Sequence, residues 1–168
     1  LLGTRRIAQL ALSAAVLPFA SHPVKGYDLP SGAMIDKMIA TAIGAELLAK
    51  ELSVQPPVYT FTAGLLHNVG KIILGNFVAV DVEVIRSLAF NERLSFEVAE
   101  ERVLGIGHPE AGAVLLRHWN LPDTIVDVAR WYRDPDGYSG DKLLLDLVHV
   151  ADNLTKECGL GIGVDGLN

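Results

Sequence analysis

The chain has 168 residues, half of them hydrophobic, and a formal net charge of −6. This length and composition predict one compact domain over 1–168, with enough apolar material for a sizeable core. The acidic balance, without clustered Lys and Arg, argues against a nucleic-acid or anionic-membrane surface, because such surfaces neutralise phosphates with basic residues. The apolar run over 7–20 is broken and too short to cross a bilayer, so no membrane segment is expected. The single cysteine, Cys158, excludes an intrachain disulfide and favours a reducing, cytoplasmic setting.

The N-terminal part of the chain predicts two helices. Apolar residues recur at helical spacing over 7–17, and Pro18 is expected to close this first helix. A longer amphipathic pattern extends over about 34–52, where Ser31 is the predicted N-cap. Lys37 lies within this second pattern.

The stretch 61–74 predicts one helix packed on most sides, because apolar residues follow one another at helical spacing along it. Into that core it carries two adjacent polar side chains, His67 and Asn68, which need partners if they are buried. A satisfied core histidine is the plain alternative to a functional site. Gly64 and Gly70 each cost about 1 kcal/mol relative to Ala in a helix interior, so they indicate close approach by neighbouring helices.

The second half of the chain predicts five further helices, at about 81–89, 95–104, 107–119, 123–132 and 141–156. The acidic residues of the second of these, Glu97, Glu100 and Glu101, are interpreted as a solvated face. No convincing period-two strand is present. The fold class is therefore all-α, a compact multi-helix bundle.

Four short motifs follow one another along the chain: AGLLHNVGK at 63–71, LG and HPEAGA at 104–105 and 108–113, WNLP at 119–122, and VHVAD at 148–152. In letters, order and spacing they resemble the HDOD family, the signalling branch of the HD-domain superfamily, over most of the chain. The resemblance implies an HD-type helical bundle from a bacterial signalling protein. It also implies that the chain is the HD-like core of a longer protein, without its usual N-terminal helices.

Catalytic members of that superfamily hold a divalent metal with a His on an early helix, a His-Asp dyad and a later Asp. The metal-bound hydroxide attacks a phosphoester. By this resemblance, His67 is the dyad histidine, Asp152 is the late aspartate and His108 matches another family histidine. Asn68 replaces the dyad aspartate and Lys37 the early histidine. A neutral amide is a poor ligand for a hard cation, and an ammonium cannot ligate, so the ligand set looks degraded.

Three more residues complete the predicted pocket. The paired histidines of two-metal members fall at Trp131 and Tyr132, which could stack on a nucleotide base but at this helical spacing also suit a core. His149 lies one turn before Asp152 and either orients it or lies at the edge of the core.

The replaced positions compensate one another in charge. Two neutral histidines, two aspartates and a divalent metal sum to zero, and so do the four residues at those positions here without a metal. We therefore expect the Lys37 ammonium to take roughly the place of the metal and to pair with Asp152, since an unpaired buried charge is strongly unfavourable. The alternative is that Lys37 extends to solvent from an amphipathic helix.

These observations favour a non-catalytic output or scaffold domain that binds a protein partner, a second copy of itself or a nucleotide, and that uses no cofactor. One alternative is a metal-dependent phosphohydrolase with the atypical ligand set His67, His108 and Asp152. Another is a nucleotide sensor that keeps the pocket without the chemistry. Neither a nucleic acid nor a membrane is an expected partner.

Overall fold

The structure, a computed structural model, describes residue 11 and residues 14–164. These residues form helices and turns, with one isolated bridge between Val24 and Leu29 and no strand, so the all-α prediction is confirmed. After a helical segment at 14–20, the elements are η1 (Lys25–Tyr27), α2 (Ala33–Glu51), α3 (Thr60–Leu66), α4 (Val69–Glu92), α5 (Phe96–Leu104), α6 (His108–His118), α7 (Asp123–Trp131), η2 (Pro135–Gly137) and α8 (Leu143–Glu157). Over the described ranges, no helix is both long and apolar enough to cross a membrane.

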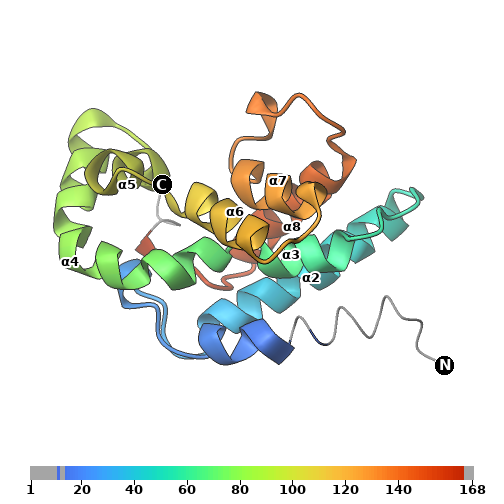
Figure 1. Cartoon of the computed structure of the whole chain (residues 1–168), viewed down its shortest axis with the longest axis horizontal. Coiled ribbons are helices and arrows are strands. Elements are labelled where there is room, and N and C mark those ends of the chain that lie inside the picture. Colours follow the sequence, from blue (N-terminus) through green and yellow to red (C-terminus); the bar gives the residue numbers. More distant parts are fainter. Residues whose placement is uncertain (1–10, 12–13, 165–168) are drawn as a thin grey trace.

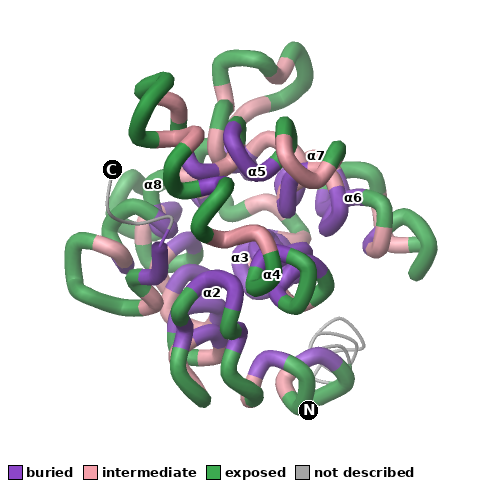
Figure 2. The backbone as a smooth tube through the Cα atoms, turned by 90° about the vertical axis from the view of Figure 1, so that its left-hand side faces the viewer, coloured by how far each residue is buried: buried purple, intermediate pink, exposed green. Residues whose placement is uncertain are grey.

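The helices pack in two groups that α7 connects. Helices α2, α3 and α8 contact one another on one side, while α4 packs against η1, α5 and α6 on the other (Figure 1). Helix α7 bridges the groups, because it contacts α3, α6 and α8. Buried positions follow the inner faces of these helices, and exposed positions gather on the loops and outer faces (Figure 2).

The predicted single helix over 61–74 is wrong, because the chain changes direction at its polar pair. Helix α3 ends at Leu66 and α4 starts at Val69, which leaves His67 and Asn68 in the turn between them. Apolar residues continue at helical spacing on both sides of this turn, so their pattern concealed it. Helix α4 then continues to Glu92 and includes the predicted helix at 81–89 as its second half.

Two glycines bring other helices close to this turn, as their positions predicted. A Cβ atom on Gly64 would lie 2.7 Å from the Cα atom of Ala42 in α2. One on Gly70 would lie 1.8 Å from the carbonyl oxygen of His108, at the start of α6. The turn is therefore held between α2 and α6.

The remaining helices agree with the prediction to within two residues at most ends, and the differences are local. Residues 7–10 and 12–13 of the first predicted helix lie outside the described residues, and Pro18 does not close that helix, which runs to Ala20. Gly32, with φ of 84°, is the N-cap of α2. Ser31, the predicted cap, donates its hydroxyl hydrogen to the Ser21 carbonyl oxygen at 2.8 Å instead.

Candidate functional site

A buried ion pair between α2 and α8 forms the centre of the site. The Nζ atom of Lys37 lies 3.0 Å from Oδ1 of Asp152, and Lys37 is only 1% exposed. The predicted pairing is therefore present, and the alternative of a solvated lysine is wrong. Gly161, beyond α8, covers the aliphatic part of this side chain, since a Cβ atom there would lie 2.7 Å from Cβ of Lys37.

His67 meets this ion pair through one ring nitrogen. Its Nδ1 donates to the carbonyl oxygen of Gly64 at 2.6 Å, while its Nε2 lies 3.1 Å from Oδ1 of Asp152. The Asn68 Nδ2 donates to the same Nε2 at 2.7 Å. Burial lowers the pKa of His67, which favours the neutral ring that this arrangement requires.

The orientation of Asn68 is set by Tyr132, at the C-terminal end of α7. The Tyr132 hydroxyl donates to Oδ1 of Asn68 at 2.6 Å, which leaves the Asn68 NH₂ group directed at His67. The same hydroxyl is hydrogen-bonded to Nε2 of His108 at 2.9 Å. Buried polar side chains thus connect His108 with His67 without a gap.

The connection ends at Glu100 of α5. His108 donates to Oε2 of Glu100 from Nδ1 at 2.8 Å and from its backbone N–H at 2.6 Å, and the Tyr27 hydroxyl donates to the other carboxylate oxygen. Burial alone would raise the pKa of Glu100, but these hydrogen bonds outweigh it and hold the pKa below its usual value. The carboxylate is therefore charged in the core.

Glu100 corrects the interpretation of α5 as a helix with a solvated acidic face. Its side chain is fully buried, and the sequence did contain a signal for this. Glu100 falls one residue after Ala99 and four after Phe96, on the stripe that carries the buried side of α5. Glu97 is partly buried and forms an ion pair with Arg133, so it is not simply solvated either. Of the three, only Glu101 keeps the predicted exposed position without a described partner.

Asp152 faces two more cations on the side away from His67. Lys156 Nζ lies 2.8 Å from its Oδ2, and Arg133 Nη1 lies 4.0 Å from the same oxygen. Burial alone would raise the pKa of Asp152, but the positive charges of Lys37 and Lys156 hold it well below its usual range. Neither Arg133, in the turn after α7, nor Lys156, in the last turn of α8, was predicted from the sequence, because no distinguishing pattern marks either residue.

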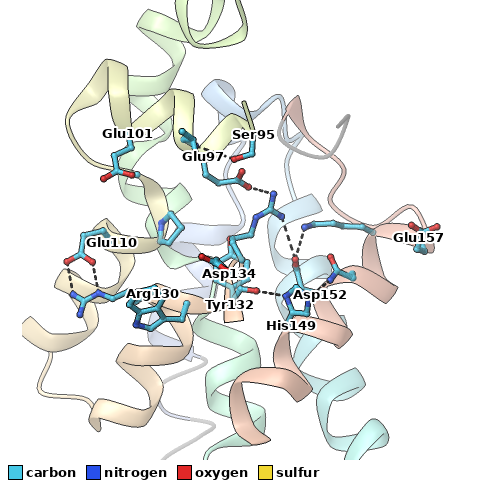
Figure 3. Close-up of a pocket in the computed structure, with 17 residues that line it drawn as sticks. Ser95, Glu97, Glu101, Glu110, Arg130, Tyr132, Asp134, His149, Asp152 and Glu157 are labelled. Atoms are coloured by element: carbon cyan, nitrogen blue, oxygen red, sulfur yellow. Dashed lines mark hydrogen bonds and ion pairs between the residues drawn. The ribbon is translucent and has the colours of Figure 1, made fainter. Parts of the chain in front are cut away.

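A cavity of about 890 Å³ opens beside this carboxylate, between α5, α6, α7 and α8 (Figure 3). Of the predicted site residues, Trp131, Tyr132, His149 and Asp152 line it. The other four, Lys37, His67, Asn68 and His108, are buried behind it in the core. The structure therefore divides the predicted pocket into a closed polar core and an open cavity that meet at Tyr132 and Asp152.

His149 does not orient Asp152, the first of its two predicted roles. Its Nδ1 donates to the backbone carbonyl oxygen of Tyr132 at 2.6 Å, and its Nε2 accepts from Asn153 at 3.1 Å (Figure 3). His149 therefore fixes the end of α7, where Tyr132 enters the core. Trp131 is partly buried on the cavity wall, with its ring centroid 6.4 Å from that of Tyr138.

A divalent metal does not fit the residues at the position where the resemblance to the HD-domain superfamily implies one. The lone pair of His67 Nε2 accepts from Asn68, and Oδ1 of Asp152 is paired with the Lys37 ammonium. Among the residues that the structure describes, no three His, Cys, Asp or Glu side chains are arranged to hold a metal ion.

The site predicts that the free energy of unfolding decreases on acidification. The pKa of His67, ordinarily 6.5, is lowered in the folded chain. As the pH falls below 6.5, the unfolded chain therefore binds a proton at His67 that the folded chain does not. The folded pKa values of Glu100 and Asp152 lie below 4.5 and 3.8, so their stabilisation is present above those values and is lost below them. Urea denaturation at a series of pH values measures this. A free energy of unfolding that increases as the pH is lowered from 6.5 to 4.5 would contradict a neutral, buried His67.

Comparison with solved structures finds the same fold in longer proteins. An HDOD domain protein with unknown function from Geobacter sulfurreducens has a TM-score of 0.75 and 25% identity, over 96% of this chain and 54% of its own. A candidate phosphohydrolase from Shewanella amazonensis has a TM-score of 0.75 and 25% identity, over 94% of this chain and 57% of its own. A candidate signal transduction protein from Marinobacter aquaeolei has a TM-score of 0.73 and 26% identity, over 97% and 37%.

Sequence comparison gives a shorter match and a family. An uncharacterized protein from Treponema pallidum is 24% identical over 75 residues, which are 45% of this chain and 15% of that protein. The chain spans about half or less of the length of each of these relatives. The family model of the HDOD domain matches residues 1–135, which include His67, Asn68 and His108 within the polar core described above, and the chain belongs to the HDOD domain family.

Proposed function

We propose that this HDOD domain is a non-catalytic output domain of signal transduction, which binds a partner and breaks no phosphoester bond. The buried ion pair of Lys37 and Asp152 is the observation that carries the proposal. In catalytic HD proteins the metal at this position lowers the pKa of a bound water and so supplies the hydroxide nucleophile. An ammonium only donates hydrogen bonds, so it can neither coordinate a water molecule nor convert it into hydroxide.

The outer face of α4 supports a protein as the partner. Phe77 is 62% exposed and Val80 82%, and Ile73 and Val84 are exposed on the same side of the helix. Further along, Phe90 is 86% exposed. Monomeric proteins rarely expose contiguous apolar patches larger than a few hundred Å², and larger ones mark interaction sites.

A nucleotide sensor is the second candidate, favoured by the cavity beside Asp152. Its volume falls within the range of about 300–1,000 Å³ typical of small-molecule sites, and Trp131 supplies an aromatic wall. The cations that line it are already paired, however. Arg130 binds Glu110 through two hydrogen bonds at 2.5 and 2.6 Å, and Arg133 pairs with Glu97. A nucleotide phosphate would have to displace one of these carboxylates.

A metal-dependent phosphohydrolase has less support from the residues, although the relative from Shewanella amazonensis is named as a candidate for that activity. It would need His67, His108 and Asp152 to share an ion. Tyr132 and Asn68 instead connect the two histidines by hydrogen bonds.

Metal content is the experiment that tests the proposal. Protein purified without chelator and then incubated with manganese, iron or zinc is expected to bind far less than one ion per chain, because both ligand atoms are already paired. It is also expected to leave bis(p-nitrophenyl) phosphate intact. Elemental analysis after gel filtration measures the metal. Stoichiometric metal that is lost in the Asp152→Asn variant would overturn the proposal and restore the hydrolase.

A thermal-shift screen with mono- and cyclic nucleotides separates the two binding candidates. A docking domain is expected to show no shift with any nucleotide, since its partner is a protein surface. A rise in melting temperature that disappears in the Trp131→Ala variant would instead favour the nucleotide sensor.

A further inference from the structure

The two residues that depart from the family's ligand set each contact one of the two ligands that remain. Asn68 donates to Nε2 of His67, and Lys37 pairs with Oδ1 of Asp152. We infer that Lys37 and Asn68 act together as a built-in replacement for the metal ion, and that the ligand geometry beneath them is still that of a metal site. This inference concerns the construction of the site and holds whichever partner the domain binds.

The separation of the two retained ligand atoms is compatible with a shared metal ion. His67 Nε2 and Asp152 Oδ1 lie 3.1 Å apart. With metal–ligand bonds of about 2.1 Å, adjacent ligand atoms lie about 3.0 Å apart in octahedral and about 3.4 Å apart in tetrahedral coordination. The pair therefore has the spacing of two neighbouring ligands, although the residues themselves bind no ion in this arrangement.

N–H donors occupy the two lone pairs that would face the ion. Nδ1 of His67 donates to Gly64, so Nε2 presents its lone pair to the site, where Asn68 donates to it. Tyr132 holds Asn68 in this orientation through the amide oxygen. At Asp152, Lys37 contacts the oxygen nearest His67, while Lys156 contacts the other oxygen and leaves that lone pair alone.

Because each replacement contacts a different ligand, reversing one of them leaves the other in place. Lys37→His alone leaves Asn68 on Nε2 of His67, and Asn68→Asp alone leaves the Lys37 ammonium on Asp152. Reversing both frees both ligand atoms and adds two more ligands. It also leaves two buried carboxylates with no lysine between them, a charge that a divalent ion balances.

Cobalt binding to the purified full chain tests the inference. The double variant Lys37→His/Asn68→Asp is expected to bind about one Co²⁺ per chain and to gain about 5 °C or more in melting temperature with excess Co²⁺. The wild type and both single variants are expected to bind none. Lys156→Met/Asn68→Asp is the matched control, because it also removes a lysine from Asp152 but keeps Lys37.

Each result decides the question. A folded double variant that binds no Co²⁺ overturns the inference and leaves the proposed function intact, whereas stoichiometric Co²⁺ in the wild type overturns both. If the double variant unfolds without metal, recovery of its helical circular dichroism on Co²⁺ addition supports the inference. A second pair with a smaller side chain, Lys37→Ala/Asn68→Asp, repeats the test with three ligands. Failure of both pairs to fold or to bind with Co²⁺ overturns the inference.

Discussion

Replacing Lys37 by Met is expected to lower the free energy of unfolding by about 3 kcal/mol or more, because breaking a buried ion pair leaves the carboxylate of Asp152 without its nearest buried cation. Met preserves most of the aliphatic volume that packs beneath Gly161, so the loss reports the charge and not a cavity. Urea denaturation at neutral pH measures the change.

Lys156 provides the matched control for this prediction. It contacts the same carboxylate at 2.8 Å, but its side chain is 17% exposed, so Lys156→Met is expected to cost about 1 kcal/mol or less. The double variant Lys37→Met/Asp152→Asn is expected to recover part of the loss, since it removes both buried charges. Equal losses for Lys37→Met and Lys156→Met would show that the buried pair has no special role.

Gly70→Ala is expected to destabilise the fold by about 3 kcal/mol or more, at or beyond the upper end of ordinary overpacking. The new Cβ atom would lie 1.8 Å from the His108 carbonyl oxygen and 2.7 Å from the Gly112 backbone nitrogen. Both contacts are with backbone, so no change of side-chain rotamer relieves them. Helices α4 and α6 would have to separate, and the connection between His108 and Asn68 would break with them. Thermal denaturation followed by circular dichroism measures the effect.

Gly44→Ala is the corresponding control in α2. A Cβ atom there would meet only Ala151, whose Cβ would lie at an ordinary distance of 3.4 Å. Because Gly in a helix interior is disfavoured relative to Ala by about 0.5–1 kcal/mol, this variant is expected to be as stable as the wild type or slightly more stable. A Gly70→Ala variant that melts at the same temperature as Gly44→Ala would contradict the close helix crossing.

The ion pair at the centre of the site could be predicted from the sequence, because a buried charge is strongly unfavourable unless an opposite charge lies beside it. Once Lys37 and Asp152 were placed near each other by the resemblance, burial left pairing as the favourable arrangement, and the structure contains that pair. Tyr132 was placed in the pocket, but its bridging role was not predicted, since its hydroxyl has one partner in the turn before α4 and the other in α6. Such partners depend on how the helices pack, which periodicity does not specify.

Apolar periodicity also fails to predict a helix end that lies inside the core. The turn at His67 and Asn68 is buried, so it lacks the exposed polar residues that usually mark a helix end. The glycines beside it, Gly64 and Gly70, were interpreted as sites of close helix packing. Glu100 shows a different error: it was interpreted as solvated because it is a glutamate, although its position in α5 lies on the apolar stripe. A glutamate on an apolar stripe is better interpreted as a buried partner for a distant donor, here His108.

The packing of α2 against α8 has a consequence for the order in which the chain folds. The Thr41 and Thr155 hydroxyls, one from each helix, lie 3.4 Å apart although 114 residues separate them in the sequence. On a growing polypeptide, α2 is complete long before its neighbour is synthesised, and the entropy of closing so long a loop is lost before the contact repays it. Docking of α8 is therefore the step that neutralises Lys37 with Asp152, and up to that moment the nascent domain carries half of its central ion pair.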